Sequence, residues 1–236
     1  QRMSRGLGDV YKRQNLILSK IYNSFNISID AECTLECNPE NVNSNIINDW
    51  KNLGINRISL GIQSFNDKSL QLMNRSHDSS KAFSSLQLLK NNFKNFSVDL
   101  IYGIPHSKLD DWKQALKIVT DLEVPHISAY VLTVEPKTAL IKMIEKNQIK
   151  GVDEKNQRDQ HMFAYEFLTK NGYENYEFSS FSKPGFQCKN NVTYWTRNQY
   201  IGFGPSAHSF NGTERKWNVS NNSTVSYTHL TLPTNC

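Results

Sequence analysis

The chain has 236 residues, of which 38% are hydrophobic and 21% are charged, as is usual for one barrel-sized globular domain or two small ones. No stretch approaches the roughly 18–20 apolar residues of a membrane span, and no secretory signal is present, so we expect a cytoplasmic protein without a membrane span. The formal net charge is +5, to which residues 1–14 contribute +3 (four basic residues against one acid), and the remaining 5 − 3 = +2 does not favour a nucleic-acid partner.

The two ends of the chain do not fit the pattern of its interior. Met3–Gln14 (MSRGLGDVYKRQ) and Val225–Asn235 (VSYTHLTLPTN) resemble translated sequencing adaptors, with native variable tails as the alternative. We therefore expect residues 1–14 and 225–236 to be foreign tails and exclude them from the prediction of the fold. On this interpretation the chain is an internal fragment, and both native termini are missing.

Strands and helices alternate in the predicted interior. Four apolar segments read as strands, in chain order Thr34–Cys37, Asn56–Ile62, Phe96–Tyr102 and His126–Leu132. Apolar residues at helical spacing lie between or beside them, in the sets Val42, Ile46, Ile47, Trp50, Leu53; Ala82, Phe83, Leu86, Leu89; and Trp112, Ala115, Leu116, Val119, Leu122. Asp78 can cap the second helix. Four successive βα units predict an α/β fold with a parallel sheet or barrel.

The pattern changes after the fourth unit. A long helix is predicted over Asp153–Asn171 and ends at Gly172, and a further strand is predicted within Tyr173–Phe181. We expect residues 15–182 to form the partial barrel and residues 183–224 to begin a smaller C-terminal region.

Polar side chains stand at or just after the ends of the predicted strands. Glu36, Gln63, Asp99 and Thr133 occupy such positions, and Arg75 lies in the loop region between the second and third strands. Because the carboxyl ends of parallel strands share one mouth, these residues should converge there on a zwitterionic or nucleoside-like ligand. Each residue alone also has a structural explanation. Asp99, for example, could form an ion pair with Arg57 or Arg75.

The segments TLECNPENV, NRISLGIQSFND, LMNRSHD and VDLIYGIP resemble, in order and spacing, the haem chaperone HemW and oxygen-independent coproporphyrinogen III oxidase family of radical S-adenosylmethionine (SAM) proteins. The resemblance covers most of residues 30–218. It implies a partial TIM-like (β/α) barrel that lacks its first strand or strands. It also implies that the residues matching Glu36, Gln63, Arg75, Asp99 and Thr133 line a SAM pocket.

The same family implies a [4Fe–4S] cluster. Its three cluster cysteines and its GGTP-type motif would lie upstream of Asn15, so this chain has no metal ligands of the family type. Cys33 and Cys37 form a CxxxC pair, but position 40 is Glu where the signature needs a third cysteine. On a strand, residues four apart are also about 13 Å apart, too far to share one cluster.

The C-terminal segment resembles the family in two further motifs. The sequence NNVTYW carries Asn190 where the haem chaperones have the His of a His-Asn-x-x-Tyr-Trp motif, and Asn is a poor ligand for haem iron. The sequence YIGFGPSAHSF resembles the GxGxxAH segment, which leaves His208 as the candidate for contact with haem or SAM. A packed, hydrogen-bonded histidine is the alternative.

The resemblance implies a SAM- and cluster-dependent protein of haem metabolism that binds haem and delivers it to haem-accepting proteins. The alternative within the family is oxidative decarboxylation of coproporphyrinogen III, with the porphyrinogen as the partner. An unrelated barrel enzyme that uses Asp99 and Glu36 as acid and base is a third possibility. We expect the fragment by itself to be inactive.

Overall fold

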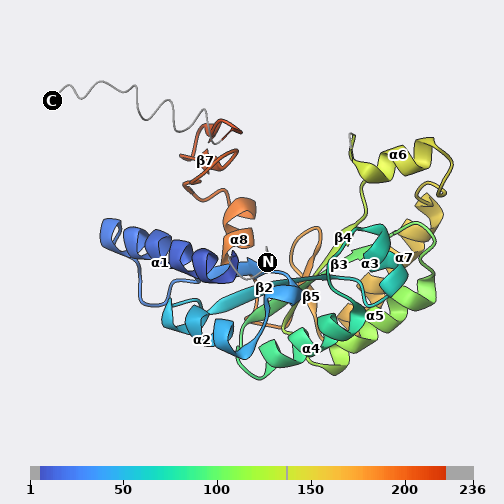
Figure 1. Ribbon diagram of the computed structural model, residues 1–236, viewed down its shortest axis with the longest axis horizontal. Coiled ribbons are helices and arrows are strands. Elements are labelled where there is room, and N and C mark those ends of the chain that lie inside the picture. Colours follow the sequence, from blue (N-terminus) through green and yellow to red (C-terminus); the bar gives the residue numbers. More distant parts are fainter. Residues whose placement is uncertain (1–5, 137, 222–236) are drawn as a thin grey trace. The chain divides into compact units, whose positions relative to one another are not determined.

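A computed structural model describes residues 6–136 and 138–221 (Figure 1). The chain divides into two compact units, one up to residue 187 and the other from residue 188, and each is described here by itself. Residues 225–236 lie outside the described residues. Helix α1 (Gly6–Ser24) runs without interruption across position 14, and the assignment of both ends as foreign tails stays a prediction, as do the boundaries of the predicted domains.

The first unit is built on a six-stranded sheet in the order β1-β2-β3-β4-β6-β5. Its strands are β1 (Thr34–Cys37), β2 (Arg57–Gln63), β3 (Phe96–Tyr102), β4 (His126–Val131), β5 (Glu174–Asn175) and β6 (Ser180–Ser182). Strands β1 to β4 pair in parallel, which confirms the predicted α/β fold with a parallel sheet. The strand predicted within Tyr173–Phe181 is instead two short strands that pair antiparallel, because the chain reverses between them.

Helices fill the connections between the strands. They are η1 (Pro39–Asn41), α2 (Ser44–Asn52), α3 (Asp67–Leu72), α4 (Ser79–Lys90), α5 (Leu109–Asp121), α6 (Ala139–Glu145) and α7 (Glu154–Lys170). The predicted cap at Asp78 is confirmed, since its side chain accepts a 2.7 Å hydrogen bond from the backbone N–H of Lys81. Asn43, Asn66 and Asp153 cap α2, α3 and α7 in the same way. Each cap satisfies a backbone donor that the first turn of a helix leaves open.

One face of the sheet forms the hydrophobic core with the helices (Figure 1). The strand residues on this face include Ile58, Leu60, Val98, Leu100 and Ile127, and the helix residues packed on them include Trp50, Leu86, Leu89, Leu116 and Val119. Phe83, predicted to belong to the core face of α4, is 38% exposed. It follows Ala82 by one residue, which turns it about 100° away from the face that Ala82, Leu86 and Leu89 share.

The other face of the sheet is polar. Side chains alternate along a strand, so the residues between the core positions point to this second face: Ser59 on β2, Ser97 and Asp99 on β3, Ser128 on β4, and Ser180 on β6. The Ser97 hydroxyl donates to Ser59 over 2.8 Å. The sheet therefore separates an apolar layer from a polar one, and the candidate site belongs to the polar side.

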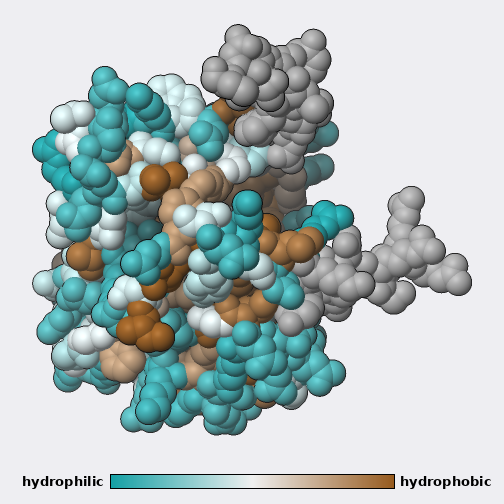
Figure 2. Space-filling view, turned by 90° about the vertical axis from the view of Figure 1, so that its left-hand side faces the viewer, coloured by the Kyte–Doolittle hydropathy of each residue, from teal (hydrophilic) through white to brown (hydrophobic). Residues whose placement is uncertain are grey.

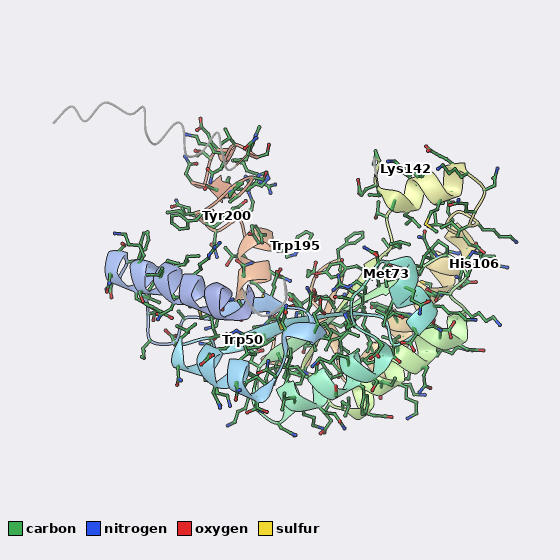
Figure 3. All side chains as sticks on the ribbon, in the orientation of Figure 1. Trp50, Met73, His106, Lys142, Trp195 and Tyr200 are labelled. Carbon is green, nitrogen blue, oxygen red and sulfur yellow. The ribbon has the colours of Figure 1, made fainter. Side chains whose placement is uncertain are left out.

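The second unit contains α8 (Lys189–Trp195) and a hairpin of β7 (His208–Phe210) and β8 (Arg215–Trp217). Tyr200 forms a bridge to Phe210 and stacks edge-on against Tyr194 at 4.7 Å between ring centroids. Trp195 and Tyr200 are labelled in Figure 3, and Trp195 is 60% exposed.

The surface of the described residues mixes apolar and polar side chains, and on the face drawn in Figure 2 hydrophobic residues are interspersed with hydrophilic ones. Of the helices in residues 6–136 and 138–221, none combines the length and the apolar character needed to cross a membrane.

Candidate functional site

Gln63 ends β2 in a strained conformation. Its φ is 67°, in the left-handed region that residues other than glycine rarely adopt. The backbone N–H of Ser64 donates to the carbonyl of Ile62 over 2.8 Å, which closes a three-residue turn around Gln63. The pairing of β2 with β3 also shifts register between Leu60 and Gln63. Strain of this kind collects at functional sites, where it directs a side chain that a regular strand would point elsewhere.

Arg75 lies in the loop between α3 and α4. Its Nη2 donates to Asn38 Oδ1 over 2.6 Å and to the carbonyl oxygen of Gly61 over 3.1 Å. The guanidinium therefore joins the end of β1 to the end of β2. Gly61 leaves room for this arrangement, because a Cβ at its position would lie 3.0 Å from Gln63 Nε2 and 3.4 Å from Arg75 Nη2.

Three of the predicted site residues line one cavity of about 350 Å³. They are Gln63, Arg75 and Thr133, and the rest of the lining consists of Leu72, Met73, Asn74, Ile101, Ile104, Leu132, Glu135, Thr138, Ala139 and Leu140. Figure 3 labels Met73, which lies at the end of α3. The cavity thus combines a guanidinium, two amides, hydroxyl groups and one carboxylate with apolar walls, and this is the mixture that an ordered small-molecule site needs.

Asp99 lies on the polar face of the sheet and is not among the residues that line this cavity. Burial raises the pKa of its carboxyl to about 6, and the charge of Glu36 acts in the same direction, whereas the hydrogen bond from Ser59 and the charge of Arg57 oppose the rise. No ion pair joins Asp99 to Arg57 or Arg75 within the described residues. Arg57 instead lies 4.0 Å from Glu32, and Arg75 binds Asn38.

Glu36 is exposed on β1 and also lies outside the cavity lining. It is the register partner of Ser59, so it shares the polar face with Asp99. The structure therefore divides the five barrel residues into two groups. Gln63, Arg75 and Thr133 surround the cavity, while Glu36 and Asp99 occupy the adjoining polar face as two acids whose charges interact.

The cysteines within residues 6–136 and 138–221 offer no cluster site. Cys33, Cys37 and Cys188 form no disulfide within the described residues, and burial, together with the charges of Asp99 and Glu40, raises the pKa of Cys37 to about 12. A thiol that stays protonated is a poor metal ligand. Across the described ranges, no three His, Cys, Asp or Glu residues are grouped as a metal ion would require. The part of the chain that the structure describes therefore has no residues that fit an iron–sulfur cluster.

His208 is exposed on β7 in the second unit. Its ring lies 6.1 Å from that of Trp217, centroid to centroid, and both line a cavity of about 750 Å³ with Ser206, Asn218, Val219, Ser220 and Asn221. The imidazole is accessible, and an exposed indole and an aliphatic side chain lie beside it among serine and asparagine side chains. Asn190 lies in the first turn of α8 and offers only an amide.

Sequence reasoning did not identify two further features of the first unit. Glu135 lines the cavity beside Thr133. His77 is buried and contacts Glu40 and the carbonyl of Ile62. Glu40 and His77 are 37 residues apart, and neither belongs to a periodic pattern. The only sequence signal for their contact is that Glu40 follows β1 and His77 lies beyond the neighbouring strand β2.

Comparison with known proteins gives one family match, since residues 9–119 match the Radical SAM superfamily. The haem chaperone HemW of Haemophilus influenzae is 37% identical over 193 residues, which cover 81% of this chain and 49% of the relative. The HemW of Lactococcus lactis is 31% identical over 208 residues, which cover 87% of this chain and 55% of the relative. The chain thus spans about half the length of these curated relatives.

A solved structure supports the fold. Coproporphyrinogen III oxidase (HemN) from Escherichia coli, described as a radical SAM enzyme, aligns with a TM-score of 0.76 and 22% identity, over 90% of this chain and 52% of the other. At this identity the likeness concerns the fold alone.

Proposed function

Because the chain carries a radical SAM domain and is similar to the haem chaperones named HemW, as its sequence motifs predicted, we propose that it is the SAM-binding part of a protein that binds haem and delivers it. One observation carries the proposal for SAM. Gln63, Arg75 and Thr133, which are 70 positions apart at the extremes, surround a single cavity of about 350 Å³. Radical SAM membership implies SAM and a [4Fe–4S] cluster, and the cavity fits the first of these.

The cavity offers a partner for each part of the SAM molecule. Arg75 can bind the carboxylate of the methionine moiety, and Glu135 brings negative charge for its ammonium group or sulfonium. Gln63 and Thr133 supply groups that both donate and accept, as ribose hydroxyls and a nucleobase require. Met73, Ile101 and Leu132 add apolar surface for the adenine ring. In this superfamily bound SAM supplies radical chemistry when a reduced cluster is present.

Asp99 and Glu36 have a different part in this proposal. Both lie on the polar face that adjoins the cavity, and SAM is a cation at its sulfonium. The two carboxylates lower the potential there and favour a positively charged ligand. We assign Asp99 and Glu36 this electrostatic role. Direct contacts with SAM are assigned to the residues that line the cavity.

The proposal places haem on the second unit, with His208 as its axial ligand and Trp217 beside the ring. Haem-accepting proteins would be the partners in delivery, in the cytoplasm. Oxidation of coproporphyrinogen III remains the alternative, but its support is a likeness of fold at 22% identity.

The test uses the full-length protein, purified without oxygen and with its cluster reconstituted. We expect calorimetry to detect SAM binding, and haem titration to give a saturable Soret band. Incubation with coproporphyrinogen III and SAM should yield no protoporphyrinogen. Turnover of the porphyrinogen would contradict haem delivery as the function and favour the oxidase, whereas absence of SAM binding would contradict the proposed cavity.

A further inference from the structure

We infer that His77, held by Glu40, is a positioning residue that sets the direction of Arg75 and the strained turn at Gln63, and thereby the affinity of the cavity for its ligand. This inference rests on the proposed SAM site. It concerns residues that do not line the cavity themselves.

His77 is buried, with 5% of its surface exposed. Its Nδ1 lies 3.2 Å from Glu40 Oε2, and its Nε2 lies 3.1 Å from the carbonyl oxygen of Ile62. Both ring nitrogens thus face oxygen acceptors. The ring is therefore held between the Glu40 carboxylate and the carbonyl of the turn at Gln63.

Glu40 is the matching anion. It accepts a hydrogen bond from the Ser76 hydroxyl over 2.5 Å in addition to its contact with His77. Burial opposes ionisation of Glu40, but the bond from Ser76 and the charge of His77 together lower the pKa of its carboxyl. The loop after β1 and the loop after α3 are therefore joined by a charge-assisted contact, which is stronger than a neutral hydrogen bond.

The carbonyl that His77 binds is the one that closes the turn at Gln63. The Ile62 oxygen accepts from Ser64 N–H over 2.8 Å and faces His77 Nε2 at 3.1 Å. A backbone with φ of 67° at Gln63 costs free energy and persists only where the surroundings hold it. His77 supplies such a restraint, and it does so without lining the cavity itself.

Arg75 precedes His77 by two residues in the same short loop. Its bonds to Asn38 and the Gly61 carbonyl repeat the pattern of the His77 bonds to Glu40 and the Ile62 carbonyl. Both Arg75 and His77 thus hold the loop to the segment after β1 and to the end of β2. A shift of His77 should also shift Arg75, because only Ser76 separates the two residues.

The experiment compares SAM affinity by calorimetry in the full-length, cluster-reconstituted protein. His77→Gln keeps a polar side chain but has no pair of separated ring nitrogens to contact both Glu40 and the Ile62 carbonyl, and we expect about tenfold weaker binding, within the range for coupled neighbours. His161→Gln is the matched control. His161 lies on α7, is exposed, and forms a hydrogen bond with Tyr102 of β3. The control should bind SAM like the wild type.

A double-mutant cycle separates positioning from a general effect on folding. Because His77 acts in part through Arg75, His77→Gln should weaken binding clearly less in the Arg75→Ala background than in the wild type, where the remaining effect comes from the turn at Gln63. Full additivity of the two substitutions would overturn the inference. If His77→Gln does not fold, Glu40→Gln replaces it in the same cycle, because it keeps the side-chain shape and removes the charge.

The outcomes for the two proposals differ. Wild-type affinity in folded His77→Gln or Glu40→Gln overturns the inference and leaves the SAM site intact, provided that Arg75→Ala weakens binding. Wild-type affinity in Arg75→Ala removes the SAM site itself.

Discussion

The Ser59 hydroxyl lies 3.3 Å from both carboxylate oxygens of Asp99, across the polar face of the sheet. Ser97 donates in turn to Ser59. This short chain of hydrogen bonds partly offsets the cost of burying an acid between apolar strand residues. It does not abolish that cost, because burial still raises the pKa of Asp99 to about 6.

The raised pKa of Asp99 predicts a dependence of stability on pH. The pKa of Asp99 in the folded state lies above the ordinary value of 3.8 for an aspartate, so the folded state binds the proton more tightly than the unfolded state. The associated stability is present below pH 3.8 and is lost as pH rises through about 6. Asp99→Asn, which stays neutral, should therefore gain up to about 3 kcal/mol over the wild type between pH 4 and pH 8.

Denaturant unfolding of both proteins at pH 4, 6 and 8 measures this difference. Asp110→Asn, a change at an exposed acid on α5, serves as the control. A constant difference between Asp99→Asn and the wild type across the range would contradict the prediction.

The lowered pKa of His126 predicts that stability depends on pH with the opposite sign. Burial, followed by the charge of Arg57, lowers the pKa of His126 to about 3, and Nε2 lies 2.7 Å from the Tyr176 hydroxyl. The unfolded chain binds a proton near pH 6.5 that the folded state excludes. Stability is therefore present above 6.5 and is lost toward pH 3, with a slope of about 1.4 kcal/mol per pH unit.

The measurement compares stability between pH 7 and pH 4.5 in the wild type and His126→Gln. The variant is expected to be less stable at pH 7 and to have a flatter acid slope. An unchanged slope would show that His126 titrates alike in both states.

The close packing around Gly61 predicts that a methyl group added there displaces side chains at the cavity. In Gly61→Ala the new Cβ would lie 3.0 Å from Gln63 Nε2 and 3.3 Å from Asn38 Oδ1, so both side chains must move. We expect about tenfold weaker SAM binding with little change in melting temperature, since the three atoms nearest to the new Cβ belong to polar side chains outside the core. Gly151→Ala is the control, because its nearest neighbour would be 3.9 Å away. Equal affinity in the two variants would speak against a site at Gly61.

Haem binding should depend on His208. We expect His208→Ala to lose or shift the Soret band of the haem complex and to weaken haem affinity by at least about tenfold, because it removes the axial nitrogen. His106→Ala, a change at another exposed histidine (labelled in Figure 3), should leave the spectrum unchanged. An unaltered spectrum in His208→Ala would direct the search for the ligand elsewhere.

Helix α4 offers a test of the core. Leu86→Ala should destabilise the protein by about 2–5 kcal/mol, because Leu86 is fully buried and its removal leaves a cavity. Phe83→Ala removes a larger side chain from the same helix but should cost less, since Phe83 is 38% exposed. Equal losses of unfolding free energy in the two variants, measured with denaturant, would indicate that Phe83 belongs to the core face after all.

Local sequence patterns were enough to predict the order and type of the main elements. Strand β3 occupies the predicted range Phe96–Tyr102, and Asp78 caps α4 as expected. These features depend on local periodicity and on single capping residues, which neighbouring positions encode. The same locality explains the errors. Helical spacing did not separate Phe83 from Ala82, and a bend divided the last predicted strand into β5 and β6.

The sequence also named the strand-end residues but could not assign them to groups. Only the tertiary structure placed Gln63, Arg75 and Thr133 around one cavity and Glu36 with Asp99 on the adjoining polar face. Which side chains meet depends on strand register, on the shift in β2 before Gln63 and on how each loop crosses the strand ends. Such contacts join residues tens of positions apart, as Glu40 and His77 do, and no local pattern specifies them.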